Sequence, residues 1–340
     1  MKRVRLRFVD DIDVDFVDRE QALKRVVEWA RRGTRLVQVV YGPEGCGKTA
    51  WLKQSAELLR ELGFDVIYVD PLHRDFIAYT DLKEIIKDLA DAAGEVIGRA
   101  EIRLATLAID LVKYALKRGR KRIAVLVDDA FQAIGLDKAA TYVKGLLGLI
   151  EYPPADYERI VAVVATSEGI SRREIGRHRW ANSLPMWNMS REGFKQLYDQ
   201  LPGDKPSFEE VWRLTGGNPG ALANLMMNEW VFDRVVDWLI KEKRVKGFIS
   251  SLTDYERELL AKAVEDPDVL MSREGIGLMD KLVELNLIVD VIPKRDPWSW
   301  IDAPPPERDI EHGIGIDIAW QTPLHREAVR RSLEFYGEKR

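Results

Sequence analysis

A glycine-rich segment, GPEGCGKT at positions 42–49, constrains the fold of this 340-residue chain more than any other feature. It follows the apolar run RLVQVVYG (35–42) and precedes a helical pattern over 48–62. The segment matches G-x-x-x-x-G-K-[ST] in full, and that pattern cradles phosphate where a strand runs through a loop into a helix. The sequence therefore predicts a strand–loop–helix unit at this point of the chain.

The residue types of this segment fit a nucleotide phosphate and its metal ion. Glycines let backbone N–H groups turn inward around the β-phosphate, and Lys48 reaches the β- and γ-phosphates as a point charge. Thr49 offers its hydroxyl to Mg²⁺, and the helix that begins here adds its positive dipole end. We therefore expect ATP or ADP with Mg²⁺ as cofactors. The residues predicted to line the nucleotide here are Gly42, Pro43, Glu44, Gly45, Cys46, Gly47, Lys48, Thr49 and Ala50.

Strands and helices alternate over residues 35–189, which predicts a three-layer α/β domain around a parallel sheet. The apolar strand candidates are 35–42, 64–70, 122–130, 159–169 and 183–189. The helical patterns between them are 48–62, 80–95, 101–118, 138–150 and 171–178.

Two acids end the strand candidate RIAVLVDDA (122–130). Asp128 is predicted to act on Mg²⁺ with Thr49, and Asp129 to orient the water that attacks the γ-phosphate. Many ATPases carry Glu at the second position, and Asp is one methylene shorter. Hydrolysis is therefore expected to be slow.

Hydroxyl and guanidinium groups complete the predicted catalytic set. Thr166 or Ser167, at the end of RIVAVVATSEG (159–169), is a candidate sensor of the γ-phosphate, although hydroxyls are equally common in strand-end turns. The following segment, SRREIGRHRW, is basic, and a solvated helix face accounts for most of its arginines. Arg177 is the one that we predict to stabilise transition-state charge.

Strand patterns stop after residue 189 and helical patterns take over. We expect a P-loop ATPase core over 1–190, a helical lid over 191–246 and a winged-helix-like domain over 247–340. KEKRVKG (241–247) is the best linker candidate, and the last segment shows helices followed by two strand patterns joined by a long loop. In that loop, Trp298 and Trp300 either pack on the chain itself or face a partner.

These motifs together resemble the archaeal ATPase family, in the STAND branch of the AAA+-related P-loop ATPases. FVDRE (16–20) and TGGNPG (215–220) narrow the resemblance to this family. The resemblance extends over about residues 14–335. It implies a five-stranded sheet with an extra strand between the P-loop strand and the Asp128 strand. It also implies that Phe16, Val17 and Arg19 border the adenine and that Pro219 lies near the nucleotide.

The chain departs from the family pattern at the sensor. Thr-Gly-Ser is usual there, and this chain has Ala165-Thr166-Ser167, which leaves the sensor residue open between the last two. A winged-helix histidine touches the ADP β-phosphate in related proteins, and His325 could be compared with it. A surface histidine at a helix start is the better interpretation of His325.

Composition limits the partners and the compartment. The single cysteine rules out an internal disulfide, and no apolar run approaches the roughly 18 residues of a membrane span, so we expect a cytoplasmic protein without membrane contact. The N-terminus shows no secretory signal pattern. Charged residues make up 32% of the chain, as in thermophile proteins. Residues 247–340 hold 12 Lys and Arg against 19 Asp and Glu, a net charge of −7 that disfavours DNA as a partner.

Three functional hypotheses follow. The first is an ATP-hydrolysing switch that the exchange of ATP for ADP controls, as members of the family often are, with an unidentified protein partner. The second is a DNA-associated ATPase like the origin-recognition initiators, which the basic segment at 171–179 supports and the acidic C-terminal segment opposes. The third is a nucleotide-binding scaffold with little hydrolysis. The sequence leaves oligomerisation open.

Overall fold

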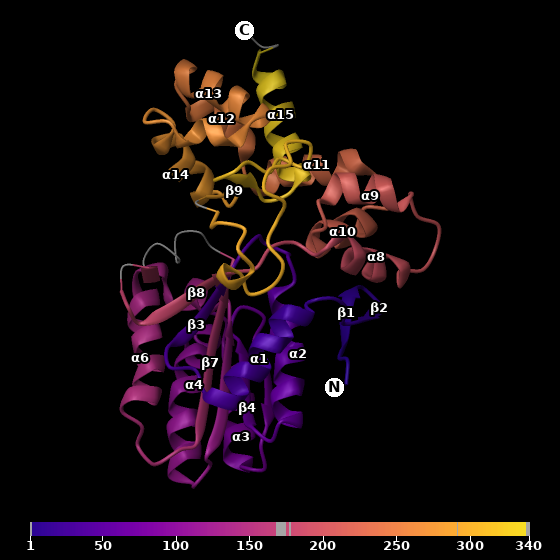
Figure 1. Ribbon diagram of the computed structural model, residues 1–340. Helices are drawn as coiled ribbons and strands as arrows, with labels where there is room; N and C mark the ends of the chain where they lie inside the picture. Colours follow the sequence, from indigo (N-terminus) through magenta and orange to yellow (C-terminus); the bar gives the residue numbers. More distant parts are fainter. Residues whose placement is uncertain (1, 168–174, 177, 291, 338–340) are drawn as a thin grey trace. The chain divides into compact units, whose positions relative to one another are not determined.

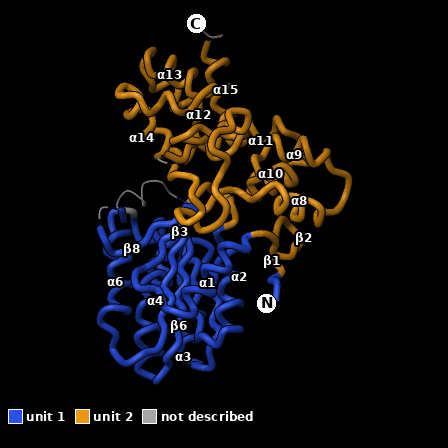
Figure 2. Tube along the Cα trace, in the orientation of Figure 1, with its two compact units in different colours: residues 1–4, 19–41, 48–185 blue, residues 5–18, 42–47, 186–340 orange. Residues whose placement is uncertain are grey.

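The computed structural model describes residues 2–167, 175–176, 178–290 and 292–337 (Figure 1). The chain divides into two compact units, coloured separately in Figure 2. Unit 1 comprises Met1–Val4, Arg19–Tyr41 and Lys48–Pro185, and unit 2 comprises Arg5–Asp18, Gly42–Gly47 and Met186–Arg340. The division into three domains remains a prediction. None of the helices in the described ranges is both long and apolar enough to span a membrane.

Unit 1 is built on a six-stranded sheet with the order β5-β4-β6-β7-β3-β8. Five strands are parallel and correspond to the five strand predictions, and β7 lies between β3 and β6 as the family resemblance implies. The five-strand expectation is wrong by one, because β5 pairs antiparallel with β4 at the edge. The strands are β3 (Val37–Tyr41), β4 (Asp65–Asp70), β5 (Asp75–Tyr79), β6 (Arg122–Asp128), β7 (Arg159–Thr166) and β8 (Ala181–Pro185).

Helices cover both faces of this sheet, which confirms the three-layer α/β prediction (Figure 1). Helices α1 and α2 pack on one face, and α4 and α6 pack on the other. Every residue from Ile123 to Val127 is fully buried, as expected for a strand with two covered faces. The helices are α1 (Glu20–Arg32), α2 (Lys48–Glu61), α3 (Lys83–Ala93), α4 (Ala100–Lys117), α5 (Ala130–Ile134) and α6 (Ala139–Glu151), with a 3₁₀ turn at Leu136–Lys138. The helix predicted over 171–178 lies largely outside the described residues.

Unit 2 begins with a hairpin of β1 (Arg5–Val9) and β2 (Ile12–Asp15) and continues as helices. Ser190 caps α8 by accepting a hydrogen bond from the backbone N–H of Gly193 at 3.0 Å. The helices around the TGGNPG turn are α8 (Arg191–Asp199), α9 (Phe208–Thr215), α10 (Pro219–Met227) and α11 (Phe232–Glu242). They share an apolar cluster that includes Phe194 and Leu222.

The C-terminal part of unit 2 has a second apolar cluster, which includes Leu260 and Trp320. Its two strands contain two residues each and pair antiparallel, so the winged-helix assignment remains a prediction. The elements are α12 (Val245–Ser251), α13 (Asp254–Glu265), α14 (Ile276–Glu284), β9 (Ile288–Val289), β10 (Ala319–Trp320) and α15 (Pro323–Gly337), with 3₁₀ turns at Pro267–Met271 and Pro297–Ser299.

The structure describes the predicted linker and both loop tryptophans of unit 2. The predicted linker at 241–247 is mostly helical, because α11 and α12 leave only Lys243 and Arg244 between them. Trp300 is buried and donates its indole N–H to the carbonyl of Lys294 at 2.9 Å, so it packs on the chain itself. Trp298 has 74% of its surface exposed.

Candidate functional site

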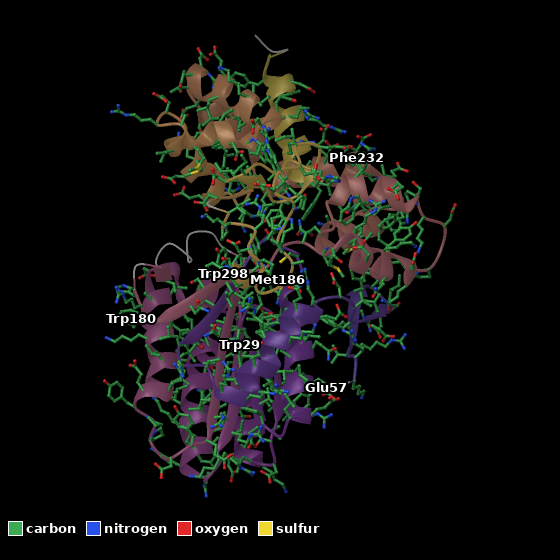
Figure 3. All side chains as sticks on the ribbon, in the orientation of Figure 1. Trp29, Glu57, Trp180, Met186, Phe232 and Trp298 are labelled. Atoms are coloured by element: carbon green, nitrogen blue, oxygen red, sulfur yellow. The ribbon has the colours of Figure 1, made fainter. Side chains whose placement is uncertain are left out.

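The phosphate-loop motif is split between the two units: residues 42–47 belong to unit 2, and Lys48 and Thr49 begin α2 in unit 1. The loop takes backbone conformations that require glycine, since φ is +74° at Gly45 and +101° at Gly47. A Cβ on Gly42 would lie 1.9 Å from the carbonyl oxygen of Met186, a residue labelled in Figure 3. These three glycines therefore have separate backbone reasons to be present.

Cys46 fills space inside the loop. Its side chain is fully buried, with Sγ 3.8 Å from the carbonyl oxygen of Met186. Its backbone N–H donates to the carbonyl of Pro43 at 3.2 Å and so closes a turn within the loop.

In unit 1, the first turn of α2 lies against the end of β6. The Lys48 side chain is buried, and its charge acts on the Asp128 carboxylate. The Thr49 hydroxyl donates a hydrogen bond to the same carboxylate. Ala50, the third residue of the helix, is partly exposed. The predicted metal-binding pair, Thr49 and Asp128, is thus in direct contact.

Asp128 is a strongly perturbed carboxylate. Burial raises its pKa to about 7, with smaller contributions from the negative charges of Asp129 and Asp70. Its Oδ2 accepts a hydrogen bond from the Tyr68 hydroxyl at 3.2 Å. Its Oδ1 is buried and has no hydrogen-bond partner among the residues that the structure describes. A buried carboxylate oxygen without a partner, beside a threonine hydroxyl, fits the oxygen ligands that Mg²⁺ prefers.

Asp129 is held in position by the strand that precedes it and by the neighbouring strand. Its φ of +40° lies in the left-handed region, which is uncommon for a residue other than glycine. Its Oδ1 accepts hydrogen bonds from the Ser167 backbone N–H at 3.1 Å and from the Ser167 hydroxyl at 3.4 Å. Thr166, the last residue of β7, is buried. The structure therefore places Ser167 on Asp129 and leaves both sensor candidates at the end of β7.

Two residues of this region were missed by the sequence reasoning, Tyr68 and Asp70 on β4. Tyr68 is fully buried, and Asp70 is 2% exposed with its carboxylate 2.9 Å from Nδ1 of His73. The pairing of β4 with β6 brings both side chains to Asp128. The only signal in the sequence was the polar end of the strand candidate at 64–70.

The structure describes most of the remaining predicted site residues. Phe16 is buried in unit 2, and Val17 packs against the α8–α11 cluster. Arg19 precedes α1 in unit 1 with φ of +68° and is 2% exposed. Arg177 lies outside the described residues. His325 is buried in the first turn of α15, so the expectation of a surface histidine is wrong.

The TGGNPG turn reaches the phosphate loop within unit 2. Pro219 is the first residue of α10, and the Asn218 side chain caps this helix by accepting from the Ala221 N–H at 2.9 Å. The same amide donates its N–H to the carbonyl of Glu44 at 2.9 Å. The Gly220 N–H donates to the carbonyl of Gly45 at 3.0 Å. The turn thus binds the loop through two hydrogen bonds, and Asn218 is a site residue that the sequence reasoning did not single out.

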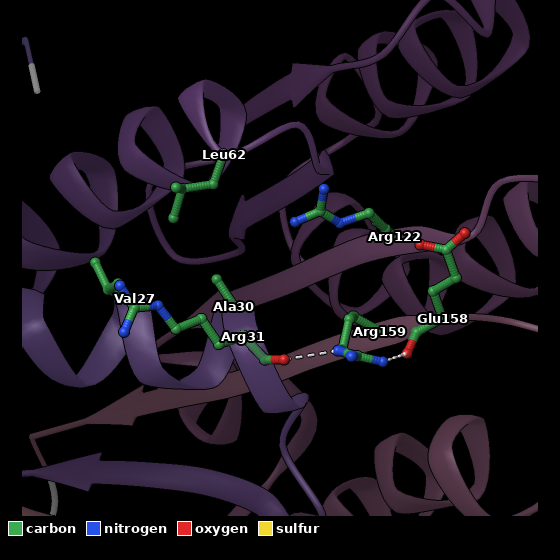
Figure 4. A pocket seen from close by; sticks show the side chains of 7 residues that line it. All are labelled: Val27, Ala30, Arg31, Leu62, Arg122, Glu158 and Arg159. Carbon is green, nitrogen blue, oxygen red and sulfur yellow. Dashed lines mark hydrogen bonds between the residues drawn. The ribbon is translucent and has the colours of Figure 1, made fainter.

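A cavity of about 260 Å³ in unit 1 lies at the amino ends of the central strands β6 and β7 (Figure 4). Arg122 and Arg159, the first residues of β6 and β7, line it with Arg31 near the end of α1. Asp128 is at the opposite end of β6, so this cavity is separate from the candidate nucleotide site.

Several solved structures are similar to this chain at low identity. The Aeropyrum pernix ORC2 protein, in ADPNP–ADP complexes, matches with a TM-score of 0.41 and 15% identity over 93% of each chain. Cdc6p from Pyrobaculum aerophilum matches with a TM-score of 0.38 and 16% identity over 97% of each chain. Similarity at this level transfers no ligand or partner to this chain. No curated protein matches the sequence significantly.

A family comparison is more decisive. The model of an ATPase domain found predominantly in Archaea matches residues 16–225, more than half of the chain. The match includes the phosphate loop, the strand ending in Asp128, both sensor candidates and the TGGNPG turn. The chain is therefore an ATPase and belongs to this predominantly archaeal family.

Proposed function

We propose that the chain hydrolyses Mg²⁺-bound ATP and acts as a switch controlled by the exchange of ATP for ADP. The observation that carries the metal assignment is Asp128, a buried carboxylate with one unpartnered oxygen that contacts Thr49 and lies in the field of Lys48. A divalent cation would neutralise a charge that the fold otherwise buries at a cost in stability.

Each residue has a defined role in this proposal. Bound Mg²⁺ would neutralise charge on the β- and γ-phosphates, with Thr49 and Asp128 holding it directly or through water. Lys48 would bind the same phosphates from the first turn of α2. Asp129, held by Ser167, would accept a hydrogen bond from the attacking water. The oxygen of that water would bond to the γ-phosphorus while the bond from the γ-phosphorus to ADP breaks. Thr166 or Ser167 would sense the γ-phosphate, and Arg177 would stabilise the charge that develops.

The switch part of the proposal is supported by the TGGNPG turn. Its hydrogen bonds to Glu44 and Gly45 connect the phosphate loop to the helical part of unit 2. A change in the loop on loss of the γ-phosphate would therefore act on α10 through these bonds. Phe16, Val17, Arg19 and Pro219 are proposed to border the nucleotide.

The experiment that tests this function compares Lys48→Ala with Lys83→Ala. Both lysines are first residues of helices, and Lys83 is exposed at the start of α3. Lys48→Ala is expected to abolish ATP binding and hydrolysis, and Lys83→Ala to keep both. Full activity of Lys48→Ala would exclude the proposal. Binding without single-turnover hydrolysis in the unchanged protein would instead favour a nucleotide-binding scaffold.

A protein partner is the better proposal than DNA for the output of the switch. The charge of −7 over residues 247–340 works against the phosphate neutralisation on which DNA affinity largely depends. An electrophoretic shift assay with duplex DNA at near-physiological salt, with and without ATP, separates the two. Tight and salt-sensitive binding would favour DNA.

A further inference from the structure

Glu44 occupies a variable position of the phosphate-loop motif, yet within unit 2 it is held through three different groups. Its backbone N–H donates to Oε1 of Gln321 at 2.8 Å. Its backbone carbonyl accepts from Asn218, and its carboxylate forms an ion pair with Nζ of Lys243 at 2.8 Å. The nearest of these partners in sequence is 174 positions away. Three distant segments of the chain therefore meet at one residue of the loop.

Gln321 is a buried partner whose side-chain amide is bonded at both ends. It follows β10, is 2% exposed, and its side-chain Nε2 lies 3.4 Å from both Oδ1 of Asn286 and the carbonyl oxygen of Ile288. Its backbone N–H donates to the carbonyl of Leu287 at 3.0 Å. Because both ends of this amide are engaged, Oε1 is held in a fixed position facing the Glu44 N–H.

Asn218 provides an equally defined contact. Its Nδ2 donates to the Glu44 carbonyl and also to Oδ1 of Asn188 at 2.8 Å, while its Oδ1 caps α10. Gly220 and Gly45 approach so closely that a Cβ on either would lie within 2.9 Å of a Cα atom of the other. The side-chain amides that bond to the N–H and to the carbonyl of Glu44 are thus themselves held by other groups of unit 2. Together they set the orientation of the loop backbone at Glu44.

The ion pair adds a contact that is specific to charge. The Lys243 side chain is 17% exposed and the Glu44 side chain 52%, so solvent screens the pair in part. Lys243 lies at the junction of α11 and α12. A single exposed pair of this kind stabilises little, but it can be tested by reversing both charges.

We propose that Gln321, Lys243 and Asn218 are positioning residues of the phosphate loop, which act through Glu44 and thereby let residues after position 186 set the nucleotide affinity. The inference rests on the proposed nucleotide site at residues 42–49. A loop already held in one conformation loses less conformational entropy when phosphate binds, so the contacts strengthen binding. By reciprocity, bound nucleotide strengthens the contacts between the loop and the C-terminal segment.

The first test replaces Gln321 with methionine, which has a similar volume and no carbonyl to accept from the Glu44 N–H. The Kd of the full chain for a fluorescent ADP analogue is expected to rise about fivefold to tenfold, the equivalent of one lost hydrogen bond. The matched control is Gln200→Met. Gln200 also bridges a backbone through its side chain, to Asp15 at 2.7 and 3.1 Å, but in the β1–β2 hairpin region of unit 2. The control is expected to keep the original Kd.

The second test reverses the charges and does not depend on a buried side chain. Glu44→Lys and Lys243→Glu are each expected to weaken ADP binding, and the double variant to recover to within about twofold of the unchanged protein. A purely structural role in folding would not produce this recovery of affinity.

The outcomes are distinct from those of the functional test. If Lys48→Ala still binds the ADP analogue normally, the proposed nucleotide site itself fails. If Lys48→Ala loses binding while Gln321→Met and both charge reversals keep the original Kd, or bind more tightly, only the positioning role is overturned.

Discussion

At the scale of single residues, Asp128 is expected to trade stability for activity. Its raised pKa means that the folded chain holds the protonated form more readily than the unfolded chain does, so this carboxylate destabilises the fold above about pH 4, where the unfolded chain ionises. Asp128→Asn keeps an acceptor for Tyr68 and Thr49 without the charge. In urea unfolding at pH 8 without metal, we expect the variant to gain about 1–2 kcal/mol, and we expect ATP hydrolysis to fall at least about 100-fold.

The two readouts for Asp128 move in opposite directions, which separates a functional carboxylate from a structural one. The stability gain is expected to shrink as pH falls toward 4, because Asp128 of the unchanged protein then becomes protonated. A variant that loses both stability and activity would contradict the assignment.

His325 predicts a pH dependence of the opposite sign. Burial lowers its pKa to about 4, with a smaller effect of Lys243 in the same direction and of Glu44 against it, and its Nδ1 lies 2.8 Å from the Thr322 hydroxyl. The unfolded chain therefore takes up a proton first, and the fold loses up to about 3 kcal/mol between about pH 6.5 and pH 4. In a pH series of urea unfolding, His325→Asn is expected to remove this part of the slope. An unchanged slope would show that other groups control it.

At the scale of elements, the turn from β3 into the phosphate loop depends on a glycine without space beside it. Gly42→Ala would drive a Cβ into the Met186 carbonyl, and we expect a loss of about 3 kcal/mol. The control is Gly148→Ala inside α6, where no atom lies within 4 Å of the added Cβ, and it is expected to gain about 0.5–1 kcal/mol. Thermal unfolding of both variants measures the contrast, and equal melting temperatures would argue against a steric cause.

Most of the sheet in unit 1 could be predicted from the sequence because its strands are continuous apolar runs. In β3 and β6, consecutive residues are buried on both faces, so no other element type fits such short Val-rich segments. The strand β5 was missed because DFIAY is only half-buried throughout and lies at the edge. Its pairing with β4 comes from a short turn after Asp70 that has no apolar signal of its own.

The candidate site was predictable where local motifs define it and not where tertiary pairing does. Lys48, Thr49 and Asp128 follow from a loop pattern and a strand ending. Tyr68 joins them only because β4 lies beside β6, and Gln321 joins the loop across 277 positions. Such contacts depend on strand order and on packing in unit 2, which periodicity does not encode.

At the scale of the whole molecule, the chain passes between the two units five times, at residues 4–5, 18–19, 41–42, 47–48 and 185–186. The phosphate-loop motif contains one of these crossings and begins at another. A nucleotide that binds only the folded chain stabilises it, so global stability is a readout of nucleotide binding.

Nucleotide binding is expected to appear as a change in thermal stability. A ligand that binds only the folded chain stabilises it by about 2.7 kcal/mol at a concentration of 100 Kd, so Mg²⁺-ADP is expected to raise the melting temperature by several degrees and its removal to reverse the shift. Lys48→Ala is expected to show no shift, and Lys83→Ala a full one. A shift that survives in Lys48→Ala would place binding elsewhere. The cavity of Figure 4 would then be the first alternative to test, through Arg122→Ala, because three arginines line it together with Glu158.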